Sequence, residues 1–353
     1  MTHATLVTSI DESTGKTAIT LALAQLAAEA GEEVGYMKPK GTRLQSNVGK
    51  TLDGDPMLAR DVLGLDAEMH QMEPIVYSPT FVEQAVRGKE DPAELRETVA
   101  EQFDALAADK DHVFVEGGGS LTTGGIIDLT DDAVAEVIDA RVVLVATYER
   151  PTDVDDVVAA ADRLGDRLDG VVFNLVADAD YDELETDVVP FLEGRGTPVE
   201  GVLPRERDLA GVTVGDLADE LGAQVLTEVP TGEYVERFSV GAMGSDEALR
   251  HFRRTKDAAV ITGGDRADIH TAALEAPGVK CLILTGGHRP SGAVVGKAAE
   301  KGVPILLVQT DTLTTVDRAE EVVRSGRTRD AETVDAMQAL LADHADVDGL
   351  LGH

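Results

Sequence analysis

The chain has 353 residues, more than one ordinary domain contains, so two domains are expected. Its 66 acidic residues outnumber 31 basic ones, and the net charge of −35 comes from acids spread along the whole sequence. Such a surface repels nucleic acid and anionic membranes, and neither is expected as a partner. The single cysteine, Cys281, excludes a disulfide framework and a cysteine-based metal site.

The charge also predicts the solvent in which the chain folds. Self-repulsion among so many acids is costly at low salt, whereas at molar salt the screening length falls to about 3 Å. We therefore expect the cytoplasm of an extreme halophile; an acidic protein from an ordinary cell is the alternative. The sequence begins directly with an apolar strand and holds no membrane-spanning apolar run, so no signal peptide and no membrane segment are expected.

Short apolar strands alternate with helical segments through the first half of the chain. This pattern is typical of a mostly parallel sheet with helices on both faces, and it predicts an α/β domain over residues 1–210. The expected strands cover residues 4–7, 34–37, 112–115, 142–146, 170–173 and 199–202. The expected helices cover residues 16–30, 93–106, 153–164 and 181–192.

The same alternation restarts after Leu226 and predicts a second, smaller α/β domain over residues 226–345. Strands are expected at residues 258–261, 281–284 and 305–308, and helices at residues 265–275, 292–301 and 332–342. The boundary falls near residues 205–230, where no low-complexity linker separates the two domains.

The first strand leads into a loop that ends in Gly15-Lys16-Thr17, where the first helix begins. This strand–loop–helix context is that of a P-loop, in which backbone N–H groups at the helix N-terminus face a phosphate. Lys16 then lies between the β- and γ-phosphates, and the Thr17 hydroxyl binds Mg²⁺. Ile10 stands where the usual pattern has its first Gly, and an ordinary turn with a solvated lysine is the alternative.

Two further residues follow the second strand. Lys38 precedes Pro39 at the strand end, where it can reach a phosphate or a carboxylate, although a surface lysine is the simpler reading. Asp55 stands between Gly54 and Pro56, a pattern that predicts the N-cap of a helix beginning at Pro56. Near a P-loop the same carboxylate can hold Mg²⁺ directly or through water.

Later strands end in polar residues as well. Glu116 closes an apolar strand before three glycines and is placed like the acid that binds Mg²⁺ beside a P-loop. Asn174 ends another strand, where it either reads a base edge or begins a turn. Pro204 follows the next strand.

This succession over residues 1–205 resembles the dethiobiotin synthetase family of P-loop proteins, whose loop carries one extra residue. The resemblance implies that ATP and Mg²⁺ bind, that Lys16 and Lys38 act in catalysis, and that Lys38 contacts substrate. It implies metal ligation by Thr17, Asp55 and Glu116. It implies nucleotide contacts from Ser9, Asp11, Thr14, Gly15, Lys16, Thr17, Asn174 and Pro204. Ser9 replaces a family Gly, and residues 77–81 do not match the family's Ser-Pro-His segment.

The second half resembles the DRTGG domain in three motifs, which cover residues 261–269, 284–290 and 310–315. Each motif follows an apolar strand, and its Asp and Thr side chains can either cap the next helix or meet an anion. The resemblance implies a homodimer that involves this domain. A synthetase-like P-loop domain followed by a DRTGG domain resembles the N-terminal regulatory part of long phosphotransacetylases, without their acetyltransferase domain.

Three hypotheses of function follow. The first is an ATP-binding regulatory protein that acts on a partner enzyme of central carbon metabolism. The second is an ATP- and Mg²⁺-dependent, carboxylate-activating ligase of the dethiobiotin synthetase type. The third is a passive oligomerisation module, against which the presence of Lys16, Asp55 and Glu116 together argues. Whether the chain is an enzyme at all stays open at this point.

Overall fold

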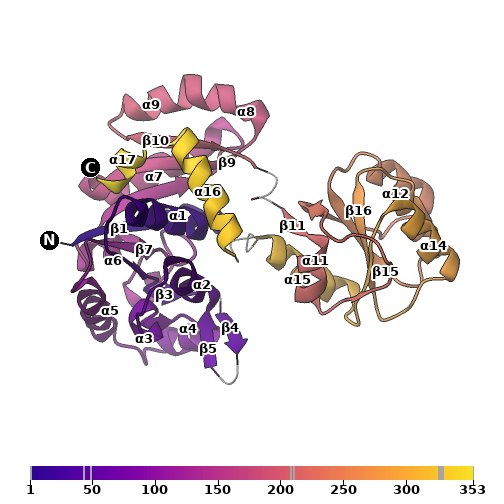
Figure 1. Cartoon of the computed structure of the whole chain (residues 1–353), viewed down its shortest axis with the longest axis horizontal. Helices are drawn as coiled ribbons and strands as arrows, with labels where there is room; N and C mark the ends of the chain where they lie inside the picture. The colour runs from indigo at the N-terminus through magenta and orange to yellow at the C-terminus, as the bar shows by residue number, and fades with distance from the viewer. Residues whose placement is uncertain are drawn as a thin grey trace. The chain divides into compact units, whose positions relative to one another are not determined.

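The computed structural model describes residues 2–42, 44–47, 50–206, 209, 211–324 and 330–352 (Figure 1). The chain forms two compact units, of which the first comprises Met1–Glu206 and Thr328–His353 and the second Arg207–Arg327. Each unit is an α/β fold with a mostly parallel sheet, as the sequence predicts. The division differs from the predicted ranges of 1–210 and 226–345 at both ends of the second unit, which begins at Arg207 and stops at Arg327, since the last helices belong to the first unit.

The sheet of the first unit has six strands in the order β10-β9-β8-β1-β7-β2, and all neighbours pair in parallel. The strands are β1 (His3–Ser9), β2 (Val34–Met37), β7 (His112–Glu116), β8 (Arg141–Ala146), β9 (Leu168–Val176) and β10 (Val199–Pro204). Their apolar runs are buried from both sides, as expected of a parallel sheet covered on both faces. The predicted strands are therefore present, and their carboxyl ends meet at one edge.

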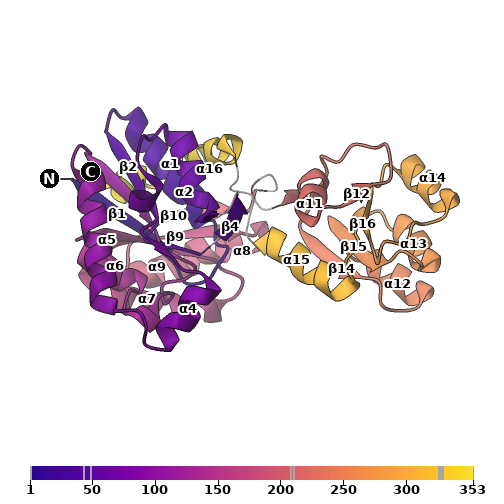
Figure 2. The ribbon, with the colours of Figure 1, turned by 90° about the horizontal axis from the view of Figure 1, so that it is seen from below.

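Helices cover both faces of this sheet (Figure 2). One face carries α1 (Lys16–Glu29) and α16 (Ala331–His344); the other carries α5 (Pro92–Ala107), α6 (Asp131–Val137) and α7 (Val154–Leu164). The short helix α17 (Val347–Leu351) packs against α1 and the strands β9 and β10. Helix α16 packs directly on α1, where Gln25 donates to Asp335 at 3.2 Å. The predicted helix near 181–192 is a continuous segment made of α8 (Asp178–Glu183), a π-helical turn (Leu184–Val188) and α9 (Val189–Glu193).

Smaller elements fill the stretch between β2 and α5. Helices α2 (Gly54–Leu63), α3 (Met69–Met72) and α4 (Pro79–Val86) lie there, together with the strand pairs β3 (Lys40–Gly41) with β6 (Ile75–Val76) and β4 (Leu44–Asn47) with β5 (Lys50–Asp53). The sequence did not predict these short pairs. Within the described residues, no helix is long and apolar enough to cross a membrane.

The second unit has a five-stranded sheet in the order β12-β17-β16-β15-β14, in which only the edge strand β12 runs antiparallel. The strands are β12 (Gln224–Val225), β14 (Arg237–Val240), β15 (Ala258–Gly263), β16 (Val279–Thr285) and β17 (Ile305–Leu307), and a small pair joins β11 (Val212–Thr213) to β13 (Tyr234–Val235). Alternate strand residues face opposite sides.

This alternation builds two cores in the second unit. Val260 and Leu282 pack under α12 (Ser245–Phe252), α13 (Ala267–Leu274) and α14 (Gly292–Lys301). Ile261 and Ile283 pack under α11 (Val214–Leu221) and α15 (Thr312–Arg324). Helix α11 precedes residue 226, so the second unit needs residues that the predicted range omits.

Candidate functional site

The P-loop occupies the carboxyl end of β1, as predicted. Gly15 adopts the left-handed conformation (φ 87°) that glycine permits, and α1 begins at Lys16 immediately after it. The Lys16 ammonium donates to Ser9 Oγ at 2.7 Å and to the carbonyl oxygen of Gly119. Burial lowers the pKa of Lys16, against the opposing charge of Glu116. The lysine therefore bridges the start of the loop and the glycine-rich turn after β7.

The end of β9 fixes the same loop. The Asn174 side-chain nitrogen donates to the carbonyl oxygen of Thr14 at 2.8 Å, so the amide positions the loop. The Thr14 hydroxyl is buried and makes no hydrogen bond with the described residues, which leaves it available to a ligand. Asp11 is exposed in the loop, and Pro204 ends the neighbouring strand β10. Nucleotide contacts by Asp11, Asn174 and Pro204 stay predictions.

A buried charged cluster lies beside the loop, at the carboxyl ends of β2 and β7. Glu116 accepts a hydrogen bond from Thr17 at Oε1 (2.8 Å) and one from the Tyr36 hydroxyl at Oε2 (2.6 Å). Lys38 contacts Glu116 Oε1 at 3.3 Å and Asp53 Oδ2 at 3.0 Å, and its ammonium donates to Asp55 Oδ2. The structure thus brings Lys16, Thr17, Lys38, Asp55 and Glu116 together from positions up to a hundred residues apart.

The pKa values in this cluster follow from burial and charge. Burial raises the pKa of Glu116 to about 7, an effect that the Lys38 ammonium partly opposes. For Lys38 burial acts to lower the pKa, but Asp55, Glu116 and Asp53 outweigh it and hold the pKa above its usual value. Burial, followed by the charge of Glu116, raises the pKa of Tyr36 well above normal. Lys38 is therefore a permanent cation at neutral pH.

The prediction that Asp55 caps a helix beginning at Pro56 is wrong. Helix α2 begins at Gly54, and Asp53 is its N-cap, accepting from the Asp55 backbone N–H at 2.9 Å. Pro56 is tolerated in the first turn because backbone N–H groups there have no partner within the helix. The Asp55 carboxylate therefore does not cap α2, and it contacts Lys38.

A second buried pair supports the loops around the cluster. Lys40 contacts Asp131 Oδ1 at 2.9 Å and donates to the carbonyl oxygen of Leu129, while Thr8 donates to Asp131 Oδ2 at 2.6 Å. A methyl group on Gly117 would lie 2.1 Å from Asp131 Oδ2, so this glycine allows the pair to approach β7. Lys40 and Asp131 therefore hold β1 and the turn after β7 in place.

The donors that converge here suit a hard divalent cation. Thr17, Asp55 and Glu116 offer one hydroxyl and two carboxylates, the oxygen ligands that Mg²⁺ prefers. Among the residues that the structure describes, no three His, Cys, Asp or Glu side chains form a group arranged to hold a metal ion. Mg²⁺ would therefore need the hydroxyl of Thr17 and further oxygens, such as those of a bound phosphate, besides the two acids.

Sequence reasoning missed four residues of the site: Tyr36, Lys40, Asp53 and Asp131. Tyr36 and Lys38 are two positions apart along one extended segment, so strand periodicity could have put them on one face. Asp53 and Asp55 have the same spacing across a helix start. Asp131 follows β7 by a loop of 14 residues (117–130), and no sequence pattern marks its contact with Lys40.

The motif residues of the second unit act, in the structure, as turn and cap residues. Asp311 accepts from the backbone N–H of Thr314 at 3.1 Å at the start of α15, and Thr285 is hydrogen-bonded to Thr312 at 2.8 Å. Gly286 and Gly287 are both left-handed (φ 77° and 69°), as the tight turn requires. These contacts favour a structural role in turns and helix caps, rather than a ligand site, for the motifs at residues 284–290 and 310–315.

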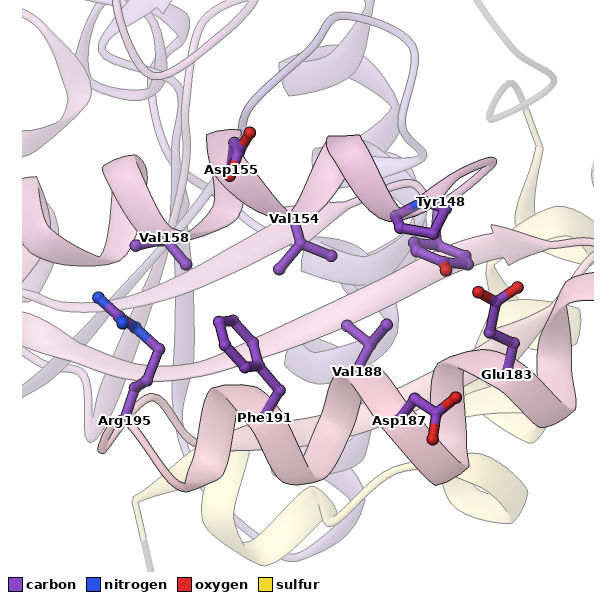
Figure 3. A pocket seen from close by; sticks show the side chains of 10 residues that line it. Tyr148, Val154, Asp155, Val158, Glu183, Asp187, Val188, Phe191 and Arg195 are labelled. Atoms are coloured by element: carbon purple, nitrogen blue, oxygen red, sulfur yellow. The ribbon is translucent and has the colours of Figure 1, made fainter.

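A separate pocket of about 480 Å³ lies between α7 and the segment of α8 and α9 (Figure 3). Val154 and Val158 face Val188 and Phe191 across it, with Tyr148 at one end. It shares no lining residue with the P-loop or the charged cluster, and sequence reasoning did not anticipate it.

Comparison with known proteins matches both halves of the chain. Residues 3–213 match the AAA_26 family model, described as an AAA domain, and residues 216–322 match the DRTGG domain model. Two phosphate acetyltransferases align with nearly the whole chain. The one from Pseudomonas putida is 26% identical over 95% of this chain and 50% of its own length, and the one from Haemophilus influenzae is 24% identical over 99% and 52%. The chain thus spans about half the length of these curated relatives.

A shorter match joins the chain to the ATP-dependent dethiobiotin synthetase BioD of Parafrankia sp., at 36% identity over 33% of this chain and 46% of that protein. Among solved structures, a ParA family ATPase from Chlorobium tepidum has a TM-score of 0.38 at 16% identity, covering 59% of this chain and 87% of its own. The CBS and DRTGG domains of a Clostridium perfringens pyrophosphatase, complexed with diadenosine tetraphosphate, have a TM-score of 0.27 at 19% identity, covering 43% and 73%.

Proposed function

The chain belongs to the AAA_26 family of AAA domains, and on that premise we propose that it is an ATP- and Mg²⁺-binding regulatory protein. Its P-loop unit and DRTGG domain together make it phosphotransacetylase-like. Nucleotide binding in the first unit would change the affinity of the chain for a partner enzyme of central carbon metabolism. By linkage, that partner would change nucleotide affinity by the same factor.

The observation that carries this proposal is the convergence of Lys16, Thr17, Lys38, Asp55 and Glu116 at one buried place. Burying charged groups costs several kcal/mol each unless partners repay it, so a purely structural role would be served better by apolar residues. This argues against the passive module. A phosphate-binding site at the same edge accounts for every member of the cluster.

Four of these five residues then have a role in binding the nucleotide or its metal ion. Lys16 binds the β- and γ-phosphates, and the backbone N–H groups at the start of α1 face the same oxygens. Thr17, Asp55 and Glu116 would hold Mg²⁺, which supplies charge neutralisation of the phosphates when bound. Asn174 keeps the loop in position through Thr14.

A dethiobiotin synthetase-like ligase is the second candidate, favoured by the 36% identity to BioD and by Lys38, whose buried ammonium can stabilise a carboxylate or carbamate anion. Turnover separates the two candidates. We expect tight ATP binding, slow hydrolysis, and no dethiobiotin from diaminononanoate and CO₂. Efficient dethiobiotin formation by the wild type, abolished in Lys16→Ala, would replace the regulator with the ligase.

The regulatory role needs its own experiment. A pull-down from the native lysate in high salt, with and without ATP and with Lys16→Ala as bait control, should recover a metabolic enzyme whose yield depends on nucleotide only for the wild type. We also propose a homodimer that involves the DRTGG domain. Light scattering on the full chain in high salt should give about twice the monomer mass of 37.3 kDa.

A further inference from the structure

The ammonium group of Lys38 occupies the place between the proposed metal ligands. Its Nζ lies 3.3 Å from Glu116 Oε1 and donates to Asp55 Oδ2, the two carboxylates assigned to Mg²⁺. A third carboxylate, Asp53, lies 3.0 Å away. The Lys38 side chain is only 2% exposed, so these contacts are made out of water.

Three carboxylates that converge in a buried place need a cation. Of the buried lysines, Lys38 supplies it, because Lys16 is directed to Ser9 and Gly119, and Lys40 contacts Asp131. Removing one partner from such a buried cluster leaves uncompensated charge, which is strongly destabilising. In this arrangement Lys38 therefore neutralises the carboxylates, as a metal ion would.

Lys38 and a metal ion compete for the same oxygens. Mg²⁺ requires oxygen ligands at about 2.1 Å in octahedral geometry, which an ammonium in contact with the same oxygens prevents. The backbone at Lys38 is fixed, since its N–H donates to Met72 at 2.7 Å and Pro39 follows. Its four-carbon stem is flexible, so an exchange needs movement of the side chain only.

We propose that Lys38 is a resident counter-ion of the metal ligands, and that Mg²⁺ binds there only in exchange for its ammonium. The inference rests on the proposed nucleotide site and explains how that site is regulated. The phosphate of a bound nucleotide offers the displaced ammonium a new anionic partner, so nucleotide and metal bind with positive coupling. Without nucleotide, the carboxylates stay paired with Lys38 and metal binds weakly.

Mn²⁺ binding without nucleotide tests this directly. Electron paramagnetic resonance of free Mn²⁺, in high KCl to suppress binding to the acidic surface, gives the affinity of the full chain. We expect Lys38→Met to bind one Mn²⁺ at least about tenfold more tightly than the wild type, a difference of about 1.4 kcal/mol. Lys89→Met removes an equal charge at an exposed position and should leave Mn²⁺ affinity unchanged.

Adding Glu116→Gln to Lys38→Met should abolish the Mn²⁺ site that Lys38→Met gains. This loss would place the Mn²⁺ site at Glu116. If Lys38→Met does not fold alone, the double variant Lys38→Met/Asp53→Asn removes one carboxylate as well and keeps a side chain able to cap α2. Equal Mn²⁺ affinity of the wild type and the Lys38 variants, or no stabilisation of them by Mn²⁺, would overturn the counter-ion role. The Mn²⁺ comparison uses no nucleotide, so its outcome is separate from that of the proposed function. Failure of the wild type to bind ATP with Mg²⁺ would contradict the proposed function instead.

Discussion

Asn174 holds the phosphate-binding loop through Thr14, whose carbonyl oxygen accepts a hydrogen bond from the Asn174 side-chain nitrogen at 2.8 Å. The bond joins the end of β9 to the residue just before Gly15, across 160 positions of sequence. It leaves almost no room at Gly15, where a methyl group would lie 2.5 Å from the same nitrogen. Asn174 therefore packs so closely against the loop that residue 15 has no space for a side chain.

Gly15→Ala should damage both stability and nucleotide binding. The residue has a φ of 87°, where a non-glycine residue costs about 1–2 kcal/mol, and the clash with Asn174 adds to that cost. Gly31→Ala is the matched control, because Gly31 has a φ of 99° with nothing within 4 Å of the added methyl. Calorimetric titration with ATP should show loss of affinity for Gly15→Ala and wild-type affinity for Gly31→Ala. An ATP affinity that is equal in Gly15→Ala and Gly31→Ala would show that Gly15 takes no part in nucleotide binding.

Glu73→Gln should stabilise the protein more as the pH rises. Burial raises the pKa of Glu73 to about 7, above the value of 4.5 for a free glutamate, so the folded state binds more protons than the unfolded state between these values. The contribution of Glu73 to stability is thus present below pH 4.5 and lost as the pH rises to 7. Glutamine stays neutral and can still accept from the Asp53 N–H, now 3.0 Å from Glu73 Oε2.

Denaturant unfolding of the wild type and Glu73→Gln at pH 5, 6, 7 and 8 measures this effect as a difference, so that other titrating groups cancel. The stability advantage of the variant should be smallest at pH 5 and should grow by at least about 1.4 kcal/mol between pH 5 and pH 8, the equivalent of one pKa unit. A difference that does not change with pH would show that Glu73 titrates normally.

Local patterns predicted the strands and the loop but not the long-range contacts. Strand β2 spans Val34–Met37 as expected, and α1 begins at Lys16, because apolar runs and Gly15-Lys16-Thr17 are local signals. The cap of α2 was misplaced by two residues, since Asp53 and Asp55 are chemically equal candidates in the sequence. Both contact Lys38 in the structure, and only the bond that Asp53 accepts from the Asp55 backbone N–H distinguishes the cap. Helix α16 was expected as a helix, but its packing on α1 depends on contacts between distant parts of the chain, such as that of Gln25 with Asp335, 310 positions apart.

That packing makes α16 part of the first unit, which carries the P-loop. Leu341 on α16 is fully buried, so Leu341→Ala should lower the stability of the first unit by about 2–5 kcal/mol. Leu313→Ala is the control, because Leu313 is 72% exposed and such positions change stability by about 0.5 kcal/mol or less. Differential scanning calorimetry should show a lowered midpoint for Leu341→Ala in the transition that Mg²⁺-ATP shifts. A midpoint equal to that of Leu313→Ala would contradict this role of the tail.

Stability should also depend steeply on salt. The net charge of −35 produces self-repulsion that dilute buffer does not screen, so thermal midpoints should rise across a KCl series. Sucrose at matched osmolality controls for exclusion of solutes from the protein surface, which stabilises folded proteins without screening charge. Midpoints that stay flat in KCl would mean that the acidic composition is no adaptation to salt.

The measurement closest to the central claim is titration calorimetry of ATP into the full chain in molar KCl, with Mg²⁺ and with a chelator. The account predicts binding that requires Mg²⁺, and a loss of at least about tenfold, or about 1.4 kcal/mol, in Lys16→Ala. Lys89→Ala, which removes the same charge from an exposed position, should bind as the wild type does. Affinity that is equal in the wild type and Lys16→Ala, or that does not depend on Mg²⁺, would contradict it.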